Sequence, residues 1–466
     1  MNMQQMSEAM RAGTPISRKN QLKLVVSLSI PAIFEQLVST LMSYIDTAMV
    51  GSLGHEATAA IGVVVSTIWM FNGIVNAAAV GFSVQVAQYL GAGRDKDSRN
   101  VLTQAMMFNV FFGLVLAAIA LILGQFLPQM LGAAPELQAD ARAYFCTVGA
   151  FLPFSLASAM YSSILRCSGN VRLPSILNVG MCLLDVVFNF FLIYPTRKIH
   201  GVTVWGAGMG VKGAALGTGL AMACIGVAML LLLIRRKGPL QLQGDENWRF
   251  TDVCLRNAVR LATPAALERL TLNLAQIVMT SVVTGMGALA VASNYVAVQA
   301  ESICYLPAFG VASAATALVG QSIGAGRPDM AKRFAYSTTV LGFALVTLTG
   351  GLLFGFAPFL TGILTPDAEV IAQATQVLRV VAFAEPMFAV SIVIMGALRG
   401  AGDSKGPFLL NLCSMWGIRV FTVLVFTRRF GLMGIWGTMT AELFFRGAIF
   451  VVRLVRGHWI HTEALQ

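Results

Sequence analysis

The strongest constraint in this 466-residue sequence is a stretch without charge that is longer than a soluble protein tolerates. From Ala57 to Gly93 there is no Asp, Glu, Lys or Arg, whereas a helix crosses a bilayer with roughly 20 apolar residues. Similar runs recur along the chain, and only 11% of the residues are charged while 57% are hydrophobic. The composition therefore excludes a water-soluble domain and predicts a multi-pass membrane protein.

Clusters of charged residues, Gly and Pro divide the chain into twelve apolar segments, each long enough for one membrane-spanning helix. The first segment starts near Leu24, contains Glu35 and Asp46, and exceeds the apolar part of a signal peptide, so we predict that it is the first helix. The predicted segments are 24–53, 58–90, 101–127, 143–165, 173–194, 209–234, 257–284, 289–323, 337–363, 372–398, 406–427 and 431–452.

An even number of spans puts both chain ends on one side of the membrane, and most basic residues gather there. The positive-inside rule makes that side cytoplasmic. Two loops on the other side are exceptions, because one contains Arg197 and Lys198 and the other contains Arg428 and Arg429. The basic residues on the cytoplasmic side are Arg11, Arg18, Lys19, Lys23, Arg94, Lys96, Arg99, Arg166, Arg172, Arg235, Arg236, Lys237, Arg327, Lys332, Arg333, Arg453 and Arg456.

The sequence matches itself at a spacing of 233 residues. Pro31-Ala-Ile-Phe-Glu35-Gln-Leu corresponds to Pro264-Ala-Ala-Leu-Glu268-Arg-Leu, and Leu90-Gly-Ala-Gly-Arg94 corresponds to Ile323-Gly-Ala-Gly-Arg327. The same register joins Leu165-Arg166 to Leu398-Arg399 and Pro174–Asn178 to Pro407–Asn411. After the fifth helix the spacing falls to 221, because the first half has about twelve extra residues around 194–208. We expect an outer loop to accommodate this insertion.

The repeat predicts the fold class and the division of the chain. Each half has six crossings, so both halves enter the membrane in the same direction and should be related by an axis along the membrane normal. We predict an all-α integral membrane protein with twelve transmembrane helices in two six-helix bundles related by a pseudo-twofold axis. Transporters of this kind rock two lobes about a central site. The predicted parts are a cytoplasmic tail at 1–23, a first lobe at 24–234, a cytoplasmic linker at 235–256, a second lobe at 257–452 and a cytoplasmic tail at 453–466.

Polar and acidic residues inside the first-half helices are candidates for ion or substrate binding. An ionisable group at bilayer depth costs about 2.5–3.5 kcal/mol on insertion scales, so its presence needs a reason. Glu35 and Asp46 are eleven residues apart in the first helix, which places them on nearly one face, roughly 16 Å apart along the axis. Asp185 and Asn189 stand at i and i+4 and also share a face. Such groups can hold a proton, Na⁺ or an organic cation.

The second half carries three further candidates, Glu268, Glu301 and Glu385. The competing interpretation is that these carboxylates only join helices through ion pairs. On that interpretation Glu268 would pair with Arg269 or Arg260, and Glu301 with Arg419. Either reading gives an acidic cluster in each half of the chain.

Several other features favour no chemistry of their own. Glu442 and Arg446, at i and i+4, predict a local ion pair rather than a binding site. The seven cysteines contain no CxxC motif, so neither a zinc site nor a disulfide framework is indicated. No nucleophile, base and orienting group can be assembled, so we predict no enzyme and no cofactor. The net charge of +11 comes from basic residues placed between helices, so it does not indicate nucleic-acid binding.

Taken together, these motifs resemble the multidrug and toxic compound extrusion (MATE) family. The resemblance rests on Tyr44-Ile-Asp46-Thr47-Ala-Met-Val-Gly51, Leu90-Gly-Ala-Gly-Arg94, Leu318-Val-Gly-Gln321-Ser-Ile-Gly-Ala-Gly326, Leu398-Arg-Gly-Ala-Gly-Asp403 and Gly213-Ala-Ala-Leu, and it covers nearly the whole chain. It implies two six-helix bundles and antiport of organic cations or amphipathic drugs against H⁺ or Na⁺, across the bacterial inner membrane with both termini cytoplasmic. The protein is expected to contact the lipid bilayer, and no obligate protein partner is predicted.

By position, Asp46 resembles the family's coupling carboxylate in the first helix, and Glu268, Glu301 and Glu385 resemble its second-lobe acidic site. The resemblance implies a transient Na⁺ either at Asp46, Asp185 and Asn189 or at those three glutamates. One common family pattern has Asn four residues before Asp in the fifth helix, and this chain has the order exchanged at Asp185 and Asn189. The sequence therefore does not determine which ion the first lobe binds. We expect Thr218 near this pair.

Two other functions are compatible with many spans. A lipid or oligosaccharide-lipid flippase of the same broader superfamily would need basic residues in its cavity to hold a pyrophosphate headgroup, and the predicted cavity is acidic. A receptor or channel would need a ligand domain or a pore-lining selectivity ring, and the sequence has neither. The antiporter is the prediction that fits the acidic residues best.

Overall fold

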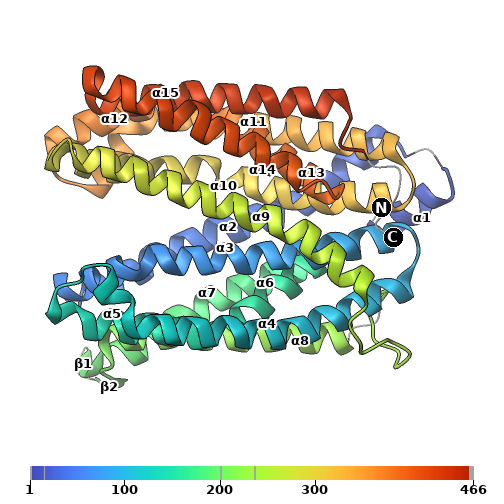
Figure 1. Ribbon diagram of the computed structural model, residues 1–466, viewed down its shortest axis with the longest axis horizontal. Helices are drawn as coiled ribbons and strands as arrows, with labels where there is room; N and C mark the ends of the chain where they lie inside the picture. The colour runs from blue at the N-terminus through green and yellow to red at the C-terminus, as the bar shows by residue number, and fades with distance from the viewer. Residues whose placement is uncertain (1–2, 15, 200–201, 236–237, 461–466) are drawn as a thin grey trace. The chain divides into compact units, whose positions relative to one another are not determined.

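The computed structural model describes residues 3–14, 16–199, 202–235 and 238–460. The predicted basic residues Arg236 and Lys237, and positions 1–2 and 461–466 of the predicted tails, lie outside the described residues. Within the described ranges the chain is almost entirely helical (Figure 1). The fold class expected from the apolar segments is therefore the one observed.

Helices cover all twelve predicted segments. Two segments are bent helix pairs, α5 with α6 and α12 with α13, and Gly431, with φ of 57°, separates the last two segments within α15. The elements are α1 (Met3–Arg11), α2 (Arg18–Gly51), α3 (His55–Gly91), α4 (Asp95–Met130), α5 (Pro135–Ala150), α6 (Leu152–Cys167), α7 (Arg172–Ile193), β1 (Pro195–Ile199), β2 (Val202–Ala207), α8 (Gly210–Arg235), α9 (Asp252–Thr284), α10 (Ala288–Gly324), α11 (Pro328–Leu364), α12 (Ala368–Ala382), α13 (Glu385–Gly400), α14 (Lys405–Leu412), the π-helix η1 (Cys413–Val420) and α15 (Phe421–Arg456).

By length and hydropathy, eight of the described helices could each cross a membrane, and ten spans result when each bent pair counts as one. The bends are 47° between α5 and α6 and 56° between α12 and α13. The predicted segments 257–284 and 431–452 are helical but fall outside this set. Both carry charged residues, and these are Arg260, Glu268 and Arg269 in the first and Glu442 and Arg446 in the second.

The helices form two compact units. The C-unit comprises the described residues of Met1–Leu37, Ala87–Gly93 and Arg260–Gln466, and the N-unit comprises Val38–Val86 and Arg94–Val259. The long helices α2, α3 and α9 therefore each contribute residues to both units. Apolar side chains make up most of the buried core in each unit.

The ends of α3 and α10 meet in the C-unit through a reciprocal pair of glycines. A Cβ atom on Gly91 would collide with the carbonyl oxygen of Gln321, and a Cβ atom on Gly324 would collide with the carbonyl oxygen of Gln88. Gln88 and Gln321 are 233 residues apart, as are Gly91 and Gly324. The two repeats thus make the same contact from both sides, and the missing side chains allow this close approach.

The described part of the insertion in the first half forms two β-strands, a feature that the sequence did not predict. Strands β1 and β2 pair antiparallel, with Arg197 opposite Val204. The guanidinium of Arg197 lies 3.9 Å from the ring centroid of Tyr194 and 4.7 Å from that of Phe190. These cation–π contacts give a local role to Arg197, one of the exceptions to the basic-residue pattern expected from the sequence.

The chain that precedes α2 is also structured. Helix α1 buries Met3, Met6 and Met10 within the C-unit. Arg327 Nη1 donates a hydrogen bond of 3.4 Å to the carbonyl oxygen of Met10, and Ser322 Oγ lies 3.5 Å from the Met10 sulfur. The predicted tail therefore packs against the second Gly-Ala-Gly-Arg turn, which contains Arg327.

The linker that follows α8 is fixed to the first turns of α4 in the N-unit. Arg99 Nε donates a hydrogen bond of 3.1 Å to Glu246 Oε1, and Lys96 Nζ lies 3.2 Å from Asp245 Oδ2. The amide N–H groups of Gln243 and Gly244 also donate to the Glu246 carboxylate, over 2.7 and 2.9 Å. Two carboxylates thus hold the first part of the linker, while Asn100 and Gln104 accept hydrogen bonds from the N–H groups of Asn247 and Thr251 further along.

We expect this attachment to be lost in acid. The hydrogen bond from Lys96 holds the pKa of Asp245 below its usual value. Burial acts to raise the pKa of Glu246, but the backbone N–H groups of Gln243, Gly244 and Glu246 together bring it below its usual value. A carboxyl group whose pKa is lower in the folded state stabilises above its unfolded value, about 3.9 for Asp and 4.3 for Glu, and this contribution disappears as the pH falls through the folded pKa.

Hydrogen exchange of the 240–251 peptide, corrected for the intrinsic pH dependence of amide exchange, measures the attachment. Protection should persist from pH 7 to about pH 5, begin to fall near the unfolded values at about pH 4, and disappear as the pH falls through the lower folded pKa values. The Glu246→Gln variant should lack protection already at neutral pH. Protection that persists unchanged to pH 3 in the unaltered protein would contradict the assignment.

Candidate ion-binding and substrate-binding sites

A pair of aspartates forms the polar centre of the N-unit. Asp46 comes from α2, and Asp185 comes from α7 together with Asn189. Asn189 Nδ2 donates to Asp46 Oδ1 over 3.0 Å and to Asp185 Oδ1 over 3.1 Å, and Thr218 Oγ1 on α8 donates to Asp185 Oδ1 over 2.9 Å. The two carboxyl groups are close enough for one to donate a hydrogen bond to the other when it is protonated. Three helices thus converge on this pair.

The local sequence explains how these groups meet. Asp185 and Asn189 share one face of α7 because they are four residues apart. Helix α8 approaches that face at Gly217, where a Cβ atom would collide with the Asn189 side chain. The absence of a side chain at Gly217 allows Thr218 to reach Asp185. Thr218 is therefore where the sequence predicted it.

A cavity of about 430 Å³ opens beside the aspartate pair within the N-unit. Asp46, Asn189 and Thr218 line it together with apolar, aromatic and hydroxyl side chains. Among the described residues that line it, Asp46 alone can carry a full negative charge near neutral pH, and none is Lys or Arg. The lining includes Ser43, Trp69, Tyr144, Phe151, Ser155 and Met222. The cavity therefore combines one carboxylate with aromatic rings, which suits an organic cation.

Two carboxyl groups at this depth need a positive partner. A lone buried charge is strongly disfavoured, and two adjacent carboxylates repel each other. A proton shared between them, a Na⁺ or a bound organic cation would each satisfy the pair. No group of three or more His, Cys, Asp or Glu suited to a metal ion occurs among the described residues. A Na⁺ here would need oxygen atoms from Asn189 or Thr218 in addition to the carboxylates.

The C-unit holds a second carboxyl pair, Glu301 on α10 and Glu385 at the start of α13. Both side chains are buried, and their carboxyl groups are close enough to share a hydrogen bond when one is protonated. Both Glu385 carboxyl oxygens and Glu301 Oε1 have no hydrogen-bond partner among the described residues. The Cys304 thiol is close enough to Glu385 to hydrogen-bond with it when protonation states permit. This pair has the same need for a proton or a cation as the aspartates.

Glu268 differs from these two glutamates because it already has a cation. Arg399 Nη2 on α13 lies 2.8 Å from Glu268 Oε2, and Asn411 Nδ2 on α14 donates to Glu268 Oε1 over 3.0 Å. The partner is therefore neither of the two arginines considered from the sequence, although Arg269 lies near enough to act electrostatically. All three residues have repeat counterparts 233 positions earlier, and these are Glu35, Arg166 and Asn178.

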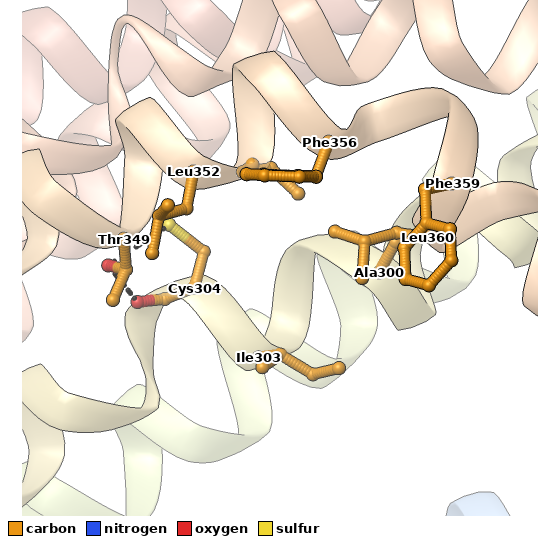
Figure 2. Close-up of a pocket in the computed structure, with 9 residues that line it drawn as sticks. Ala300, Ile303, Cys304, Thr349, Leu352, Phe356, Phe359 and Leu360 are labelled. Atoms are coloured by element: carbon orange, nitrogen blue, oxygen red, sulfur yellow. Dashed lines mark hydrogen bonds between the residues drawn. The ribbon is translucent and has the colours of Figure 1, made fainter.

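An apolar pocket of about 370 Å³ lies between α10 and α11 in the C-unit. Figure 2 shows Cys304 and Thr349 at one end of it and Phe356, Phe359 and Leu360 toward the other. Thr349 Oγ1 donates to the carbonyl oxygen of Cys304 over 2.9 Å. Phe356 and Phe359 are exposed in the described chain, as apolar side chains that face lipid would be.

The predicted residues thus fall into separate groups. Asp46, Asp185 and Asn189 meet in the N-unit, and Glu301 meets Glu385 in the C-unit. Glu268 lies in its own ion pair, and Glu35 is buried and belongs to the C-unit. The predicted Glu442–Arg446 ion pair is confirmed at 2.7 Å.

Tyr144, Arg399 and Asn411 were not among the predicted site residues. Tyr144 lines the N-unit cavity and interacts electrostatically with both aspartates. A tyrosine within an apolar segment gives no distinctive signal in a single sequence. Arg399 and Asn411 did have a signal, because both matched their counterparts in the repeat alignment.

The fold and these sites define a class, a multi-pass helical membrane protein built from two repeats with buried carboxyl pairs. The MatE family model matches residues 31–191 and again 264–425. The starts of the two matches are 233 residues apart, which is the spacing of the repeat. The chain therefore belongs to the MatE family of membrane transporters.

Relatives cover nearly the full length. The chain is 25% identical over 446 residues to a probable multidrug resistance protein NorM of Thermotoga maritima, covering 94% of this chain and 93% of the relative. It is 26% identical over 436 residues to the uncharacterized transporter YisQ of Bacillus subtilis, covering 93% and 94%. Its fold matches a crystal structure of MATE in complex with MaL6, with a TM-score of 0.87, 20% identity, and coverage of 94% of this chain and 97% of that one.

A second structural neighbour has the same fold. A transporter of the MOP superfamily from Pyrococcus furiosus, whose binding pocket is described as having reverse polarity that suggests a different function, matches with a TM-score of 0.86 at 21% identity. The match covers 94% of this chain and 95% of that one. This likeness shows the fold, and a fold alone does not decide the function.

Proposed function

We propose that the protein is a secondary antiporter that exports organic cations or amphipathic drugs in exchange for H⁺ or Na⁺. The observation that carries the proposal is the Asp46–Asp185 pair beside a cavity that has no basic residue among its described lining residues. The names of relatives, which include multidrug resistance proteins, support the same substrate class. The Glu301–Glu385 pair would serve as a second ion site in the other repeat.

The mechanism is competition for the carboxyl groups. Asp46 faces the cavity and would bind the cationic substrate, while Asp185 lies behind it, held by Asn189 and Thr218. An incoming proton or Na⁺ would neutralise the pair and displace the substrate. A ligand shifts a conformational equilibrium only through its different affinity for the two states. Coupling therefore requires that the carboxyl pair favours one conformation, inward-facing or outward-facing, when an ion is bound and the other conformation when no ion is bound.

The proposal also includes the membrane and the division of the chain. Basic residues at the chain ends and linker favour an orientation with both termini in the cytoplasm, and the bacterial relatives favour the inner membrane. The lobes would extend over 24–234 and 257–452, joined by the linker at 235–256. Glu35 and Glu268 would act in these lobes mainly through helix contacts.

Transport in proteoliposomes tests the proposal. We expect purified protein to move ethidium, a fluorescent monocation, when a pH gradient or a Na⁺ gradient is imposed, and not without a gradient. The gradient that works names the coupling ion. If a folded protein moves ethidium under none of these conditions, the antiporter proposal is wrong and lipid substrates, as for a flippase, are the next to try.

A further inference from the structure

Arg419 is a cation in the middle of an apolar span, and nothing in the proposed mechanism uses it so far. It lies in the π-helix η1, within the span Lys405–Thr427. An ionisable residue at this depth is costly and commonly functional. A π-helical turn interrupts the regular hydrogen-bond ladder and also occurs preferentially at functional sites. Both features call for a role for this side chain.

The contacts of Arg419 are weak ones. Its Nη1 lies 3.9 Å from the Met415 sulfur and its Nη2 lies 2.8 Å from the Met439 sulfur, and thioether sulfur is a poor acceptor. Its buried Nε has no hydrogen-bond partner among the described residues. By contrast, Arg399 and Arg446 in the same unit each bond directly to a carboxylate. Arg419 is thus held loosely where the other two are fixed.

Two carboxylates from different helices act on the Arg419 charge. The first is Glu442 on α15, which already accepts hydrogen bonds from Arg446 and from Ser414. The second is Glu301 on α10, whose Oε1 is unpartnered and which faces Glu385. The remaining titratable group close to the glutamate pair is the Cys304 thiol. Among the described residues, Arg419 is therefore the cation that acts on the pair, and it does so through Glu301.

We propose that Arg419 is a positioning residue that acts as a tethered counter-cation for the Glu301–Glu385 pair, competing with the proton or cation that the pair binds. When the pair is empty, the guanidinium turns toward Glu301 and neutralises it. When a proton or cation occupies the pair, the guanidinium turns back toward Glu442 and the methionine sulfurs. The inference rests on the proposed function only in treating this pair as an ion site.

Infrared titration of the protonated-carboxyl band tests this without any transported substrate. The part of the band that disappears in Glu301→Gln and Glu385→Gln reports the pair. Because a nearby guanidinium favours the charged form of a carboxyl group, Arg419→Met should move the midpoint of that part upward by about one pH unit. Arg419→Lys keeps the charge and should stay close to the unaltered protein.

Arg399→Met is the matched control, since Arg399 bonds to Glu268 and is not among the charges that act on Glu301 or Glu385. It should lower the melting temperature without moving the midpoint.

If Arg419→Met does not fold, Glu442→Gln tests the same idea in the opposite direction, because Arg419 then has Glu301 as its remaining carboxylate and the midpoint should fall. An unchanged midpoint in the variant measured would overturn the proposal. A protein that passes this test but moves no cation would overturn the proposed function alone.

Discussion

Asp46→Asn should strongly reduce gradient-driven export while leaving the fold intact. The amide keeps the size of the side chain and can still accept the hydrogen bond that Asn189 Nδ2 donates over 3.0 Å. It cannot carry charge, and Asp46 is the one acidic residue among the described residues that line the N-unit cavity. Removing one partner of a buried charge pair costs about 2–5 kcal/mol. We therefore expect substrate affinity and transport to fall by at least about 30-fold.

Ser43→Ala is the matched control, because Ser43 lines the same cavity and is neutral. Its transport rate should stay within about fivefold of the unaltered protein, as expected for a change of less than about 1 kcal/mol. Ethidium transport in proteoliposomes and the melting temperature should be measured for both variants. Transport at the unaltered rate by folded Asp46→Asn protein would remove this carboxylate from the mechanism.

Much of the fold could be predicted because the bilayer leaves few choices. Backbone polar groups have no water partners in lipid, so each apolar segment must be helical, and all twelve predicted segments lie on helices. The β-hairpin at Pro195–Ala207 was not predicted, because the insertion lies outside the apolar segments and offers no strict alternation. The helix at Met3–Arg11 was also missed, since its burial depends on contacts with residues such as Arg327 that are far away in sequence.

The sequence was enough to predict which residues are candidates for the sites, but not which of them contact one another. Intramembrane carboxylates stand out in one sequence, and i, i+4 spacing linked Asp185 to Asn189. Which carboxylate meets which arginine depends on helix packing, and Glu268 shows this. Its neighbours in sequence include Arg269, yet its hydrogen-bonded partner is Arg399, 131 residues away. The loose position of Arg419 against two methionine sulfurs has no sequence signature at all.

The Glu268–Arg399 pair leads to the largest expected change in stability. Both side chains are nearly buried, with 2% and 12% of their surface exposed, and their atoms lie 2.8 Å apart. Removing one partner of a buried pair leaves an uncompensated charge and costs about 3–5 kcal/mol. Arg399→Gln should therefore lower the free energy of unfolding by about this amount, measured by thermal or denaturant unfolding in detergent. The Glu268→Gln/Arg399→Gln double variant, with two neutral amides, should recover most of it.

The same double variant separates a helix contact from an ion site. If Glu268 serves to join α9 to α13 and α14, the double variant should recover transport together with stability, because Asn411 can still donate to the new amide oxygen. If Glu268 instead binds the coupling ion, the double variant should be stable and inactive, since no folding defect would remain to explain the loss. We expect the first result, because a carboxylate that already holds an arginine must give up that ion pair before it can bind another cation. The second result would place Glu268 beside Glu301 and Glu385 as the motif resemblance implies.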